Sequence, residues 1–361
     1  MKKRVCILPF TLDIVPILKN LPENYEVVSI LFPGKVTISR DVGEFVARKK
    51  TGYFISNELS EIKEADLVIT SEIEKTEETL YEYILQGIEY AFKHDKEIFC
   101  FTNLQDNDLQ RFENLNIGKQ NFHYIEQQRL IKADNFSYQD TPIILIGEMV
   151  PECDGYEIAL KLYHRFKKEN IRTVIISEDK YNVLYEGKSI LFWNNLDTCL
   201  AVKELNSYIQ EIEKLEKPEV IIIKLPKPMM AYDQNKVFDF GLTAYLVSYA
   251  VHIDYFVYCS IHGLASYEYM NGLSANFQKR FGYPISAVHF SNSIVDGTTD
   301  EKELINIMHT YERTDLTKEN DVLGYPVFYD LIEDDDFEDF YCNLKDDIFN
   351  FSYGVIHNGY K

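Results

Sequence analysis

Residues 147–157 have the outline of a phosphate-binding loop. They read Gly-Glu-Met-Val-Pro-Glu-Cys-Asp-Gly-Tyr-Glu and lie between an apolar run, 142–146, and an amphipathic stretch, 156–169. A strand, a short glycine-containing loop and a helix in this order can bind phosphate, because backbone N–H groups and the helix N-terminus point at the anion. The candidate cofactor-binding residues are therefore Gly147, Cys153, Asp154 and Gly155.

The same loop lacks the side chains that hold a triphosphate. A working loop has a Lys near the helix start, which neutralises the β- and γ-phosphates, and a Ser or Thr that binds magnesium. Here Gly155 or Asp154 takes the position of the Lys, and no Ser or Thr follows it. Glu148 and Glu152 add further carboxylates. Because even a solvated pair of like charges about 4 Å apart costs about 1 kcal/mol, tight ATP binding is not expected. We assign no cofactor and no metal ion to the chain.

Two other interpretations of the loop stay open. In the first, the turn is purely structural: the backbone needs Gly147 and Gly155, and Asp154 caps the helix and interacts favourably with its dipole. In the second, the carboxylates build a cation site, although their spacing matches no diagnostic ligand pattern.

Charged residues also follow two other predicted strands. Lys224 lies at the end of the apolar run 220–225, and His262 follows the run 255–259. Glu157 lies at the start of the helix after the loop. Since the carboxyl ends of parallel strands meet at one edge of a sheet, where open α/β folds bind ligands, Glu157, Lys224 and His262 are the candidate catalytic residues. A structural histidine and a solvated lysine at a strand exit are the alternatives.

The elements that would position these residues form two series. In the first, apolar runs predict strands, and apolar residues at helical spacing predict a helix over 77–93. The predicted strands lie at 4–8, 25–32, 65–70 and 97–101. This βαβ pattern indicates a small parallel sheet with helices. Residues 103–139 are rich in Asn, Gln and Asp, which is typical of connecting structure, and we place a domain boundary near Asp140.

The second series begins at 142–147, a strand apolar enough to lie in the centre of a parallel sheet. The pattern predicts further strands at 173–177, 220–225, 255–259 and 287–290, and helices at 156–169, 197–216, 242–251 and 265–280. From residue 312 it gives way to an acidic and aromatic segment that we expect to dock on the body. The sequence thus predicts an α/β protein with two domains, each a mainly parallel sheet with flanking helices, at 1–139 and 140–311, followed by the segment 312–361.

The composition excludes several classes of protein and partner. With 46% hydrophobic residues, 26 Tyr and 23 Phe among 361 residues, the chain can fill two cores and is not disordered. Its 58 acidic and 37 basic residues give a net charge of −21, and a field of that sign repels nucleic acid and anionic membranes. Basic peptides or proteins fit better as partners, and a homodimer or heterodimer stays open.

No stretch predicts export or membrane insertion. The apolar run after Arg4 is broken by Pro9, Asp13 and Pro16, and no run reaches the roughly 18 apolar residues of a membrane span. The six cysteines form no Cys-x-x-Cys pair and lie mostly in apolar runs, which is typical of reduced thiols in a cytoplasm. We expect Cys259 to be such a buried thiol rather than a nucleophile.

The loop resembles that of a family of clostridial peptide-maturation system proteins, which are encoded with Cys-rich ribosomally made peptides and their modifying enzymes. That family carries Cys-Gly-Lys-Phe-Glu after the strand. This chain matches it at Cys153, at the aromatic Tyr156 and at Glu157, and replaces the Gly-Lys pair with Asp154 and Gly155. Looser matches over most of residues 1–310 occur at Pro9, Phe10, 32–34, 40–43, Leu160, Leu162, 218–223, Pro226 and Pro228.

The resemblance implies a Rossmann-like first domain and a P-loop-like second domain with a degenerate loop. It also implies an accessory role in ribosomal-peptide (natural product) maturation, in which the chain binds a peptide substrate or a modifying enzyme of the same pathway without hydrolysing nucleotide. The alternative is a transferase or ligase that acts on a peptide at the carboxyl ends of the second domain's strands. Whether the chain is an enzyme therefore stays open.

Overall fold

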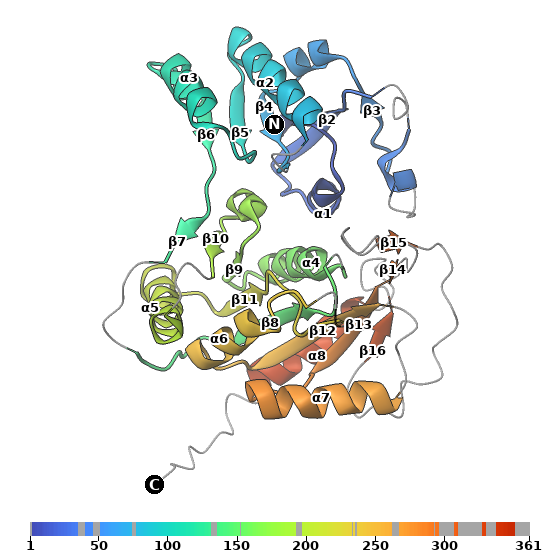
Figure 1. The fold of residues 1–361 in the computed structure, drawn as a ribbon, viewed down its shortest axis with the longest axis vertical. Helices are drawn as coiled ribbons and strands as arrows, with labels where there is room; N and C mark the ends of the chain where they lie inside the picture. The colour runs from blue at the N-terminus through green and yellow to red at the C-terminus, as the bar shows by residue number, and fades with distance from the viewer. Residues whose placement is uncertain are drawn as a thin grey trace. The chain divides into compact units, whose positions relative to one another are not determined.

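The computed structural model describes residues 2–34, 40–45, 51–73, 77–130, 136–151, 153–192, 197–232, 234, 237–261, 267–291, 293–295, 307–309, 327–329 and 337–350. The chain divides into two compact units. The first comprises 1–127 with 183–185, and the second comprises 128–182 with 186–361. Each unit is built on a parallel sheet with flanking helices, which confirms the predicted α/β class (Figure 1).

The first unit has a sheet of six strands in the order β3-β2-β1-β4-β5-β6, and every neighbouring pair is parallel. This order, in which the chain winds outward in both directions from β1, is that of a Rossmann-type sheet. The strands are β1 (Lys3–Leu8), β2 (Tyr25–Leu31), β3 (Ile55–Ser56), β4 (Leu67–Thr70), β5 (Glu97–Cys100) and β6 (Phe122–Tyr124).

Helix α2 (Glu78–Lys93) covers this sheet with the apolar face that its sequence predicts. Ile84, Ile88 and Ala91 are buried in one cluster with residues of β1, β4 and β5. The other helical segments of the first unit are η1 (Leu12–Ile14), α1 (Val15–Lys19), η2 (Val42–Phe45), η3 (Leu59–Glu64) and α3 (Asp106–Asn116).

The prediction that residues 103–139 only connect the domains is wrong. This range contains α3, β6 and β7 (Gln128–Arg129). Phe112 is the buried residue of α3, and its ring lies 5.8 Å from that of Phe122 on β6 and 6.0 Å from that of Phe92 on α2. Because so few aromatic rings anchor this edge, the elements leave little apolar periodicity in the sequence.

The second unit has a sheet of eight strands in the order β16-β13-β12-β8-β11-β9-β10-β7, again with parallel neighbours. A separate antiparallel pair joins β14 (Ser293–Val295) to β15 (Ile307–His309). The remaining strands are β8 (Ile143–Glu148), β9 (Thr173–Ser177), β10 (Lys188–Leu191), β11 (Val220–Lys224), β12 (Tyr255–Ile261), β13 (Ala287–Ser291) and β16 (Val327–Tyr329).

The direction of winding in this sheet reverses at β8. From β8 the chain passes to β9 and β10, returns to β11 beside β8, and then crosses to β12 and β13 on the other side. In open parallel sheets, ligands bind outside the carboxyl ends of the strands at such a reversal. All six residues of β8 are buried, as its apolar run predicts for a central strand.

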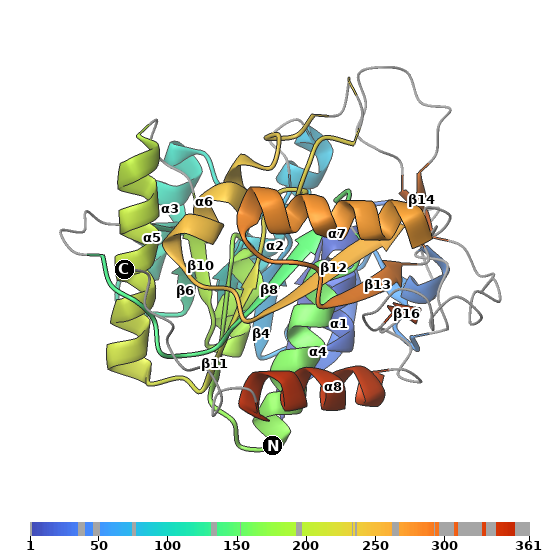
Figure 2. The same cartoon turned by 90° about the horizontal axis from the view of Figure 1, so that it is seen from below.

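Helices cover both faces of the second sheet. Figure 2 shows α6 (Leu242–Ala250) and α7 (Tyr267–Phe281) on one side of β12 and β13, and α4 (Gly155–Lys168) with α8 (Phe337–Asn350) on the other. A further helix of the unit, α5 (Thr198–Glu216), starts after Asp197, whose side chain accepts a hydrogen bond from the Leu200 N–H. Within the described ranges, no helix has the length and apolar character that crossing a bilayer would need.

Helix α8, from the acidic and aromatic segment, packs on α4 and β12. The Tyr341 ring contacts that of Phe166 at 5.2 Å and lies under the Arg165 guanidinium at 4.4 Å. Arg165 also pairs with Glu338, and Lys345 donates a hydrogen bond of 2.6 Å to Glu169 at the end of α4. Burial of aromatic rings and ion pairs therefore hold α8 against α4.

The docking of α8 should depend on pH through Glu169. The hydrogen bond from Lys345 holds the pKa of Glu169 below its ordinary value of 4.5, and Tyr341 and Arg165 add to this effect. A lowered carboxyl pKa contributes stability that is complete above the ordinary pKa and is lost as the pH falls through the folded-state value. The change Glu169→Gln should therefore cost up to about 1 kcal/mol near neutral pH and progressively less below about pH 4.5.

Urea unfolding followed by circular dichroism at a series of pH values measures this difference. Glu211→Gln removes an exposed carboxylate from α5 and is the matched control, which should show no comparable change with pH. A difference between wild type and Glu169→Gln that stays constant or grows towards acid pH would contradict the assignment.

Candidate functional site

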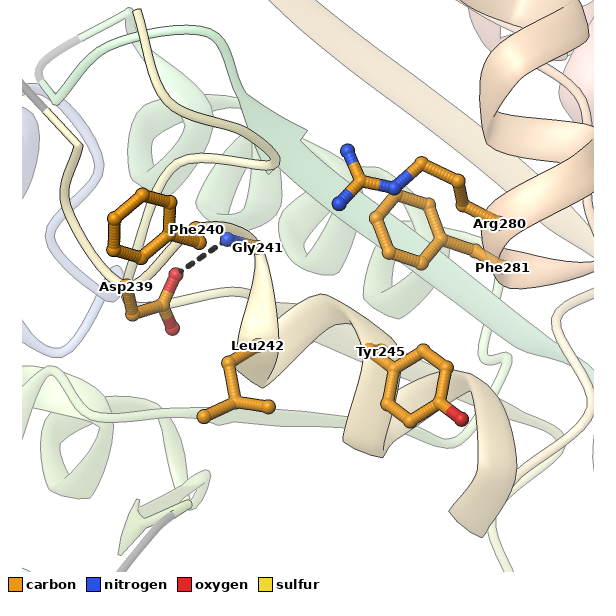
Figure 3. Close-up of a pocket in the computed structure, with 7 residues that line it drawn as sticks. All are labelled: Asp239, Phe240, Gly241, Leu242, Tyr245, Arg280 and Phe281. Carbon is orange, nitrogen blue, oxygen red and sulfur yellow. Dashed lines mark hydrogen bonds between the residues drawn. The ribbon is translucent and has the colours of Figure 1, made fainter. Parts of the chain in front are cut away.

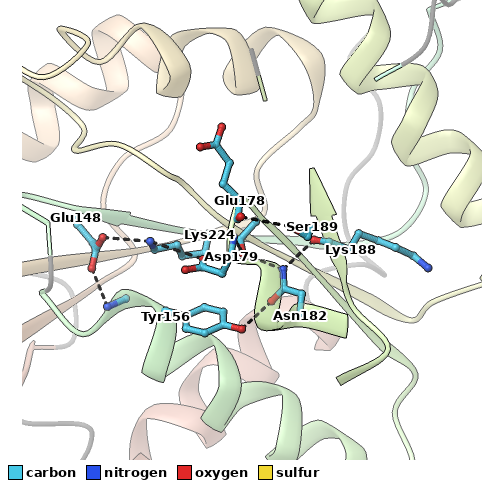
Figure 4. Close-up of polar contacts among 10 residues, drawn as sticks. Glu148, Tyr156, Glu178, Asp179, Asn182, Lys188, Ser189 and Lys224 are labelled. Carbon is cyan, nitrogen blue, oxygen red and sulfur yellow. Dashed lines mark hydrogen bonds and ion pairs between the residues drawn. The ribbon is translucent and has the colours of Figure 1, made fainter. Parts of the chain in front are cut away.

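Glu148, the last residue of β8, lies at the start of α4. Its Oε1 accepts a hydrogen bond of 2.9 Å from the N–H of Gly155, the first residue of α4. Its Oε2 lies 3.6 Å from the Nζ of Lys224, and the side chain is only 7% exposed (Figure 4). The chain's own carboxylate thus lies where a helix N-terminus would receive a phosphate.

Lys224 reaches this site from the neighbouring strand. It ends β11, which pairs with β8, so both side chains emerge at the same edge of the sheet. The side chain is 13% exposed, and its Nζ also lies 3.9 Å from Asp179 Oδ2. Burial alone would lower the pKa of Lys224, but Asp179 and Glu148 outweigh burial and raise it above the ordinary value. Lys224 is therefore not a solvated lysine at the end of a strand, and its ammonium stays protonated at neutral pH.

Asp179 is held in place by a chain of hydrogen bonds. Ser177 Oγ donates to Asp179 Oδ2 at 2.7 Å, and Asn182 Nδ2 donates to Ser177 Oγ at 2.8 Å. The Tyr156 hydroxyl donates to Asn182 Oδ1 at 3.0 Å, as Figure 4 shows. Tyr156, the aromatic position of the loop pattern, thereby ties α4 to the segment that follows β9.

Glu148 and Asp179 outnumber the one cation, Lys224, in the cluster that these three residues form. Burial raises the pKa of Glu148, while the Lys224 ammonium and the Gly155 N–H counteract that rise. With all three groups ionised, two carboxylates and one ammonium give a formal charge of −1 at the start of α4. A triphosphate placed there would meet a net repulsion in a buried environment.

Asp154 does not cap α4 with its side chain, which corrects the expectation from the sequence. It precedes the helix with φ of 68°, and its side chain makes no capping hydrogen bond. Instead, Asp154 Oδ2 lies 3.1 Å from Nε2 of His289 on β13, and both side chains are buried. Glu148 takes the capping role because its strand end points at the Gly155 N–H.

Both loop glycines are required by close packing. A Cβ at Gly155 would lie 2.9 Å from Glu148 Oε1 and 3.0 Å from its Cδ. A Cβ at Gly147 would lie 2.5 Å from the Met229 sulfur and 3.1 Å from the Phe256 ring. The glycine at 155 therefore lets Glu148 approach the helix, and the glycine at 147 lets the loop after β11 pack on β8.

Cys153 and Cys259 are buried thiols in this region. Cys259 lies opposite Glu148 in the pairing of β12 with β8. Burial raises the pKa of Cys259 well above its ordinary value, and the nearby Glu148 adds to the rise. Cys259 is thus buried, as expected, and its raised pKa disfavours the thiolate that a nucleophile needs.

Of the remaining candidates, only Glu157 lies in the described part of the chain. Glu157 is buried in the first turn of α4. His262 lies outside the described residues, directly after β12 ends at Ile261. In the part of the chain that the structure describes, no group of three or more His, Cys, Asp or Glu side chains is placed to hold a metal ion.

Sequence reasoning did not single out Asp179, Ser177 or His289 for this site. The signal for the first two was available, because Ser177 ends β9 and Asp179 follows it, and β9 lies next to β11 in the sheet. For His289 no local pattern pointed to Asp154, since the two residues are 135 positions apart.

Comparisons with known proteins find a similar fold but no related sequence. No family model and no curated protein matches the sequence. Chloroplast FtsY from Physcomitrella patens gives a TM-score of 0.28 at 12% identity, over 64% of this chain and 78% of that chain. A DUF1611 family protein from Anabaena variabilis gives a TM-score of 0.61 at 10% identity, over 97% of this chain and 100% of that chain. The α/β fold of this chain is therefore similar, along nearly its full length, to that of a DUF1611 family protein.

Proposed function

We propose that this chain is a binding protein whose second unit has the layout of a phosphate-binding domain but does not bind or hydrolyse nucleotide. The observation that supports this most strongly is the contact of Glu148 with the Gly155 N–H and with Lys224. A phosphate at this position would have to displace a buried carboxylate from its two partners. The site is therefore filled by the chain itself.

Lys224 also argues against the transferase or ligase alternative in its simplest form. An amine that acts as a nucleophile or a general base has to lose its proton near neutral pH. The carboxylates of Asp179 and Glu148 raise the pKa of Lys224 instead. Its role is to neutralise buried acids, which is structural.

The ligand that we propose comes from the resemblance of the loop. Cys153, Tyr156 and Glu157 match the peptide-maturation family, and that family's setting supplies a ribosomal precursor peptide and its modifying enzymes as partners. We propose an accessory role in which the chain binds one of these. The net charge of −21 favours a partner or peptide with basic residues.

Two measurements on the full-length chain test this function together. Phosphate release from Mg-ATP and Mg-GTP should stay at the background rate, with or without partner. Tagged chain that is co-expressed with the products of the genes beside its own should retain a short Cys-rich peptide or its modifying enzyme at stoichiometric amounts. Turnover above background, or retention of none of these products, would refute the proposal.

A further inference from the structure

A second site lies between the start of α6 and the end of α7, on the face of the sheet opposite α4. It is a hollow with a volume of about 490 Å³, and Figure 3 shows the residues that line it. Aromatic and aliphatic side chains form most of its lining, together with one cation and one carboxylate. The lining residues are Asp239, Phe240, Gly241, Leu242, Tyr245, Arg280 and Phe281.

The apolar lining of this hollow is exposed. Phe240 is 63% exposed and Tyr245 is 43% exposed, and Leu242 between them is also exposed. The Tyr249 ring, one turn further along α6, contacts the Tyr245 ring at 4.6 Å and extends the same surface. Contiguous exposed apolar groups of this kind mark interaction sites. Because the lining is so open, it fits a side chain of a longer molecule better than a small molecule that must be enclosed.

Arg280 brings a guanidinium to the hollow that is not paired with a carboxylate in the described part of the chain. Its guanidinium lies 5.6 Å from the Phe281 ring centre and forms no ion pair among the described residues. The nearby carboxylate of Asp239 is already used, because it accepts hydrogen bonds from the Gly241 N–H and from the Thr243 N–H and hydroxyl. Because Arg280 has no acidic partner among the described residues, its guanidinium is available to an external carboxylate beside the apolar lining.

The hollow is also preformed. Asp239 holds the turn before α6 through those hydrogen bonds, and Gly241 adopts φ of 76° against the carbonyl of Met229. A preformed site loses little conformational entropy when it binds a ligand.

We propose that this hollow binds the C-terminal residue of a peptide, when that residue is aromatic or large and aliphatic. The apolar side chain would enter between Phe240, Leu242 and Tyr245, and the terminal carboxylate would accept hydrogen bonds from Arg280. A C-terminal residue is the smallest group that carries one carboxylate beside an apolar side chain, which is the pairing that the hollow presents. A peptide with many further acids is disfavoured by the chain's charge of −21. The inference rests on the proposed function in that it names how the peptide is held.

Fluorescence anisotropy with short synthetic peptides tests the proposal on the full-length chain. The probe is fluorescein-labelled Gly-Ser-Lys-Gly-Ser-Phe with a free terminal carboxyl. One matched probe ends in a carboxamide and the other ends in Ala. We expect the free-acid Phe probe to bind at least about tenfold more tightly than either matched probe, because each lacks one of the two contacts.

Two pairs of variants locate the binding. Arg280→Glu should weaken binding of the free-acid probe at least about tenfold and leave the weaker binding of the carboxamide nearly unchanged. Lys279→Glu makes the same change of charge one residue away, outside the lining, and should cost less than about threefold. Tyr245→Ala should weaken binding about tenfold, and its control Tyr138→Ala, at an exposed tyrosine elsewhere, should not.

The results separate this inference from the proposed function. Absence of binding of the free-acid probe up to about 1 mM, equal affinity for the carboxamide, or equal losses in Arg280→Glu and Lys279→Glu would overturn the inference. If a co-expressed precursor peptide is still retained in that case, the proposed function stands and the peptide is held elsewhere. Turnover of Mg-ATP would instead refute the proposed function, whatever the probes do.

Discussion

Replacing Lys224 with Met is expected to lower the free energy of unfolding of the second unit by about 3–5 kcal/mol. The ammonium is the cation that lies 3.6 Å from the carboxylate of Glu148 and 3.9 Å from that of Asp179 at this buried position. Without it, two like charges would face each other at the start of α4 with no paired cation among the residues that the structure describes. Urea unfolding followed by circular dichroism measures the loss.

Two further variants test the reason for this loss. Lys227→Met makes the same change three residues away at an exposed position and should cost less than about 0.5 kcal/mol. Adding Glu148→Gln to Lys224→Met removes one of the stranded charges and should recover part of the stability, which a double-mutant cycle would report as coupling of more than about 1 kcal/mol. Additive losses, or a Lys224→Met variant as stable as wild type, would show that the three charges do not form one cluster.

The second large effect is expected from Gly241→Ala, which should destabilise the second unit by about 3 kcal/mol or more. Gly241 adopts φ of 76°, a conformation that costs a residue with a Cβ free energy. In addition, the new Cβ would lie 2.2 Å from the carbonyl oxygen of Met229, a backbone atom that cannot rotate away. The loop after β11 and the start of α6 would have to separate.

Gly282→Ala separates the two contributions to this loss. Gly282 adopts φ of 87°, but a Cβ there would meet no atom within 4 Å. This variant should therefore show only the cost of the backbone conformation, about 1 kcal/mol. Thermal unfolding of both variants measures the difference, and equal losses would mean that the contact with Met229 does not matter.

The sequence predicted those elements whose apolar residues recur regularly. The strand at β9 and the starts of β11, β12, β13 and α6 coincide with the predicted residues, and α2 starts within one residue of its prediction. These elements bury a continuous apolar face, so periodicity reports them directly. Helix α3 and strand β6 could not be found this way, since Phe112 and Phe122 are the principal anchors of this edge.

The sequence named several residues of the candidate site but did not predict the contacts among them. The loop, Gly155 and Lys224 were named because strand ends and helix starts are visible in the sequence. Two contacts depend on which strands are neighbours. The cation for the loop comes from Lys224 on β11, and Glu148 rather than Asp154 caps α4. Strand order is set by long-range pairing, and a single sequence does not encode it locally.

The hollow beside α6 was also beyond sequence reasoning. Phe240 and Tyr245 are close in sequence, but Arg280 joins them only because the end of α7 packs beside the start of α6. In the sequence, Arg280 is one of 37 basic residues and has no distinguishing neighbours.

The claim that the chain fills its own phosphate site is tested most directly by isothermal titration of the full-length protein with Mg-ATP and Mg-GTP. We predict no saturable binding up to about 1 mM, because either nucleotide would have to displace the Glu148 carboxylate from Gly155 and Lys224. Stoichiometric binding with a micromolar Kd that is lost in Gly155→Ala would contradict the account.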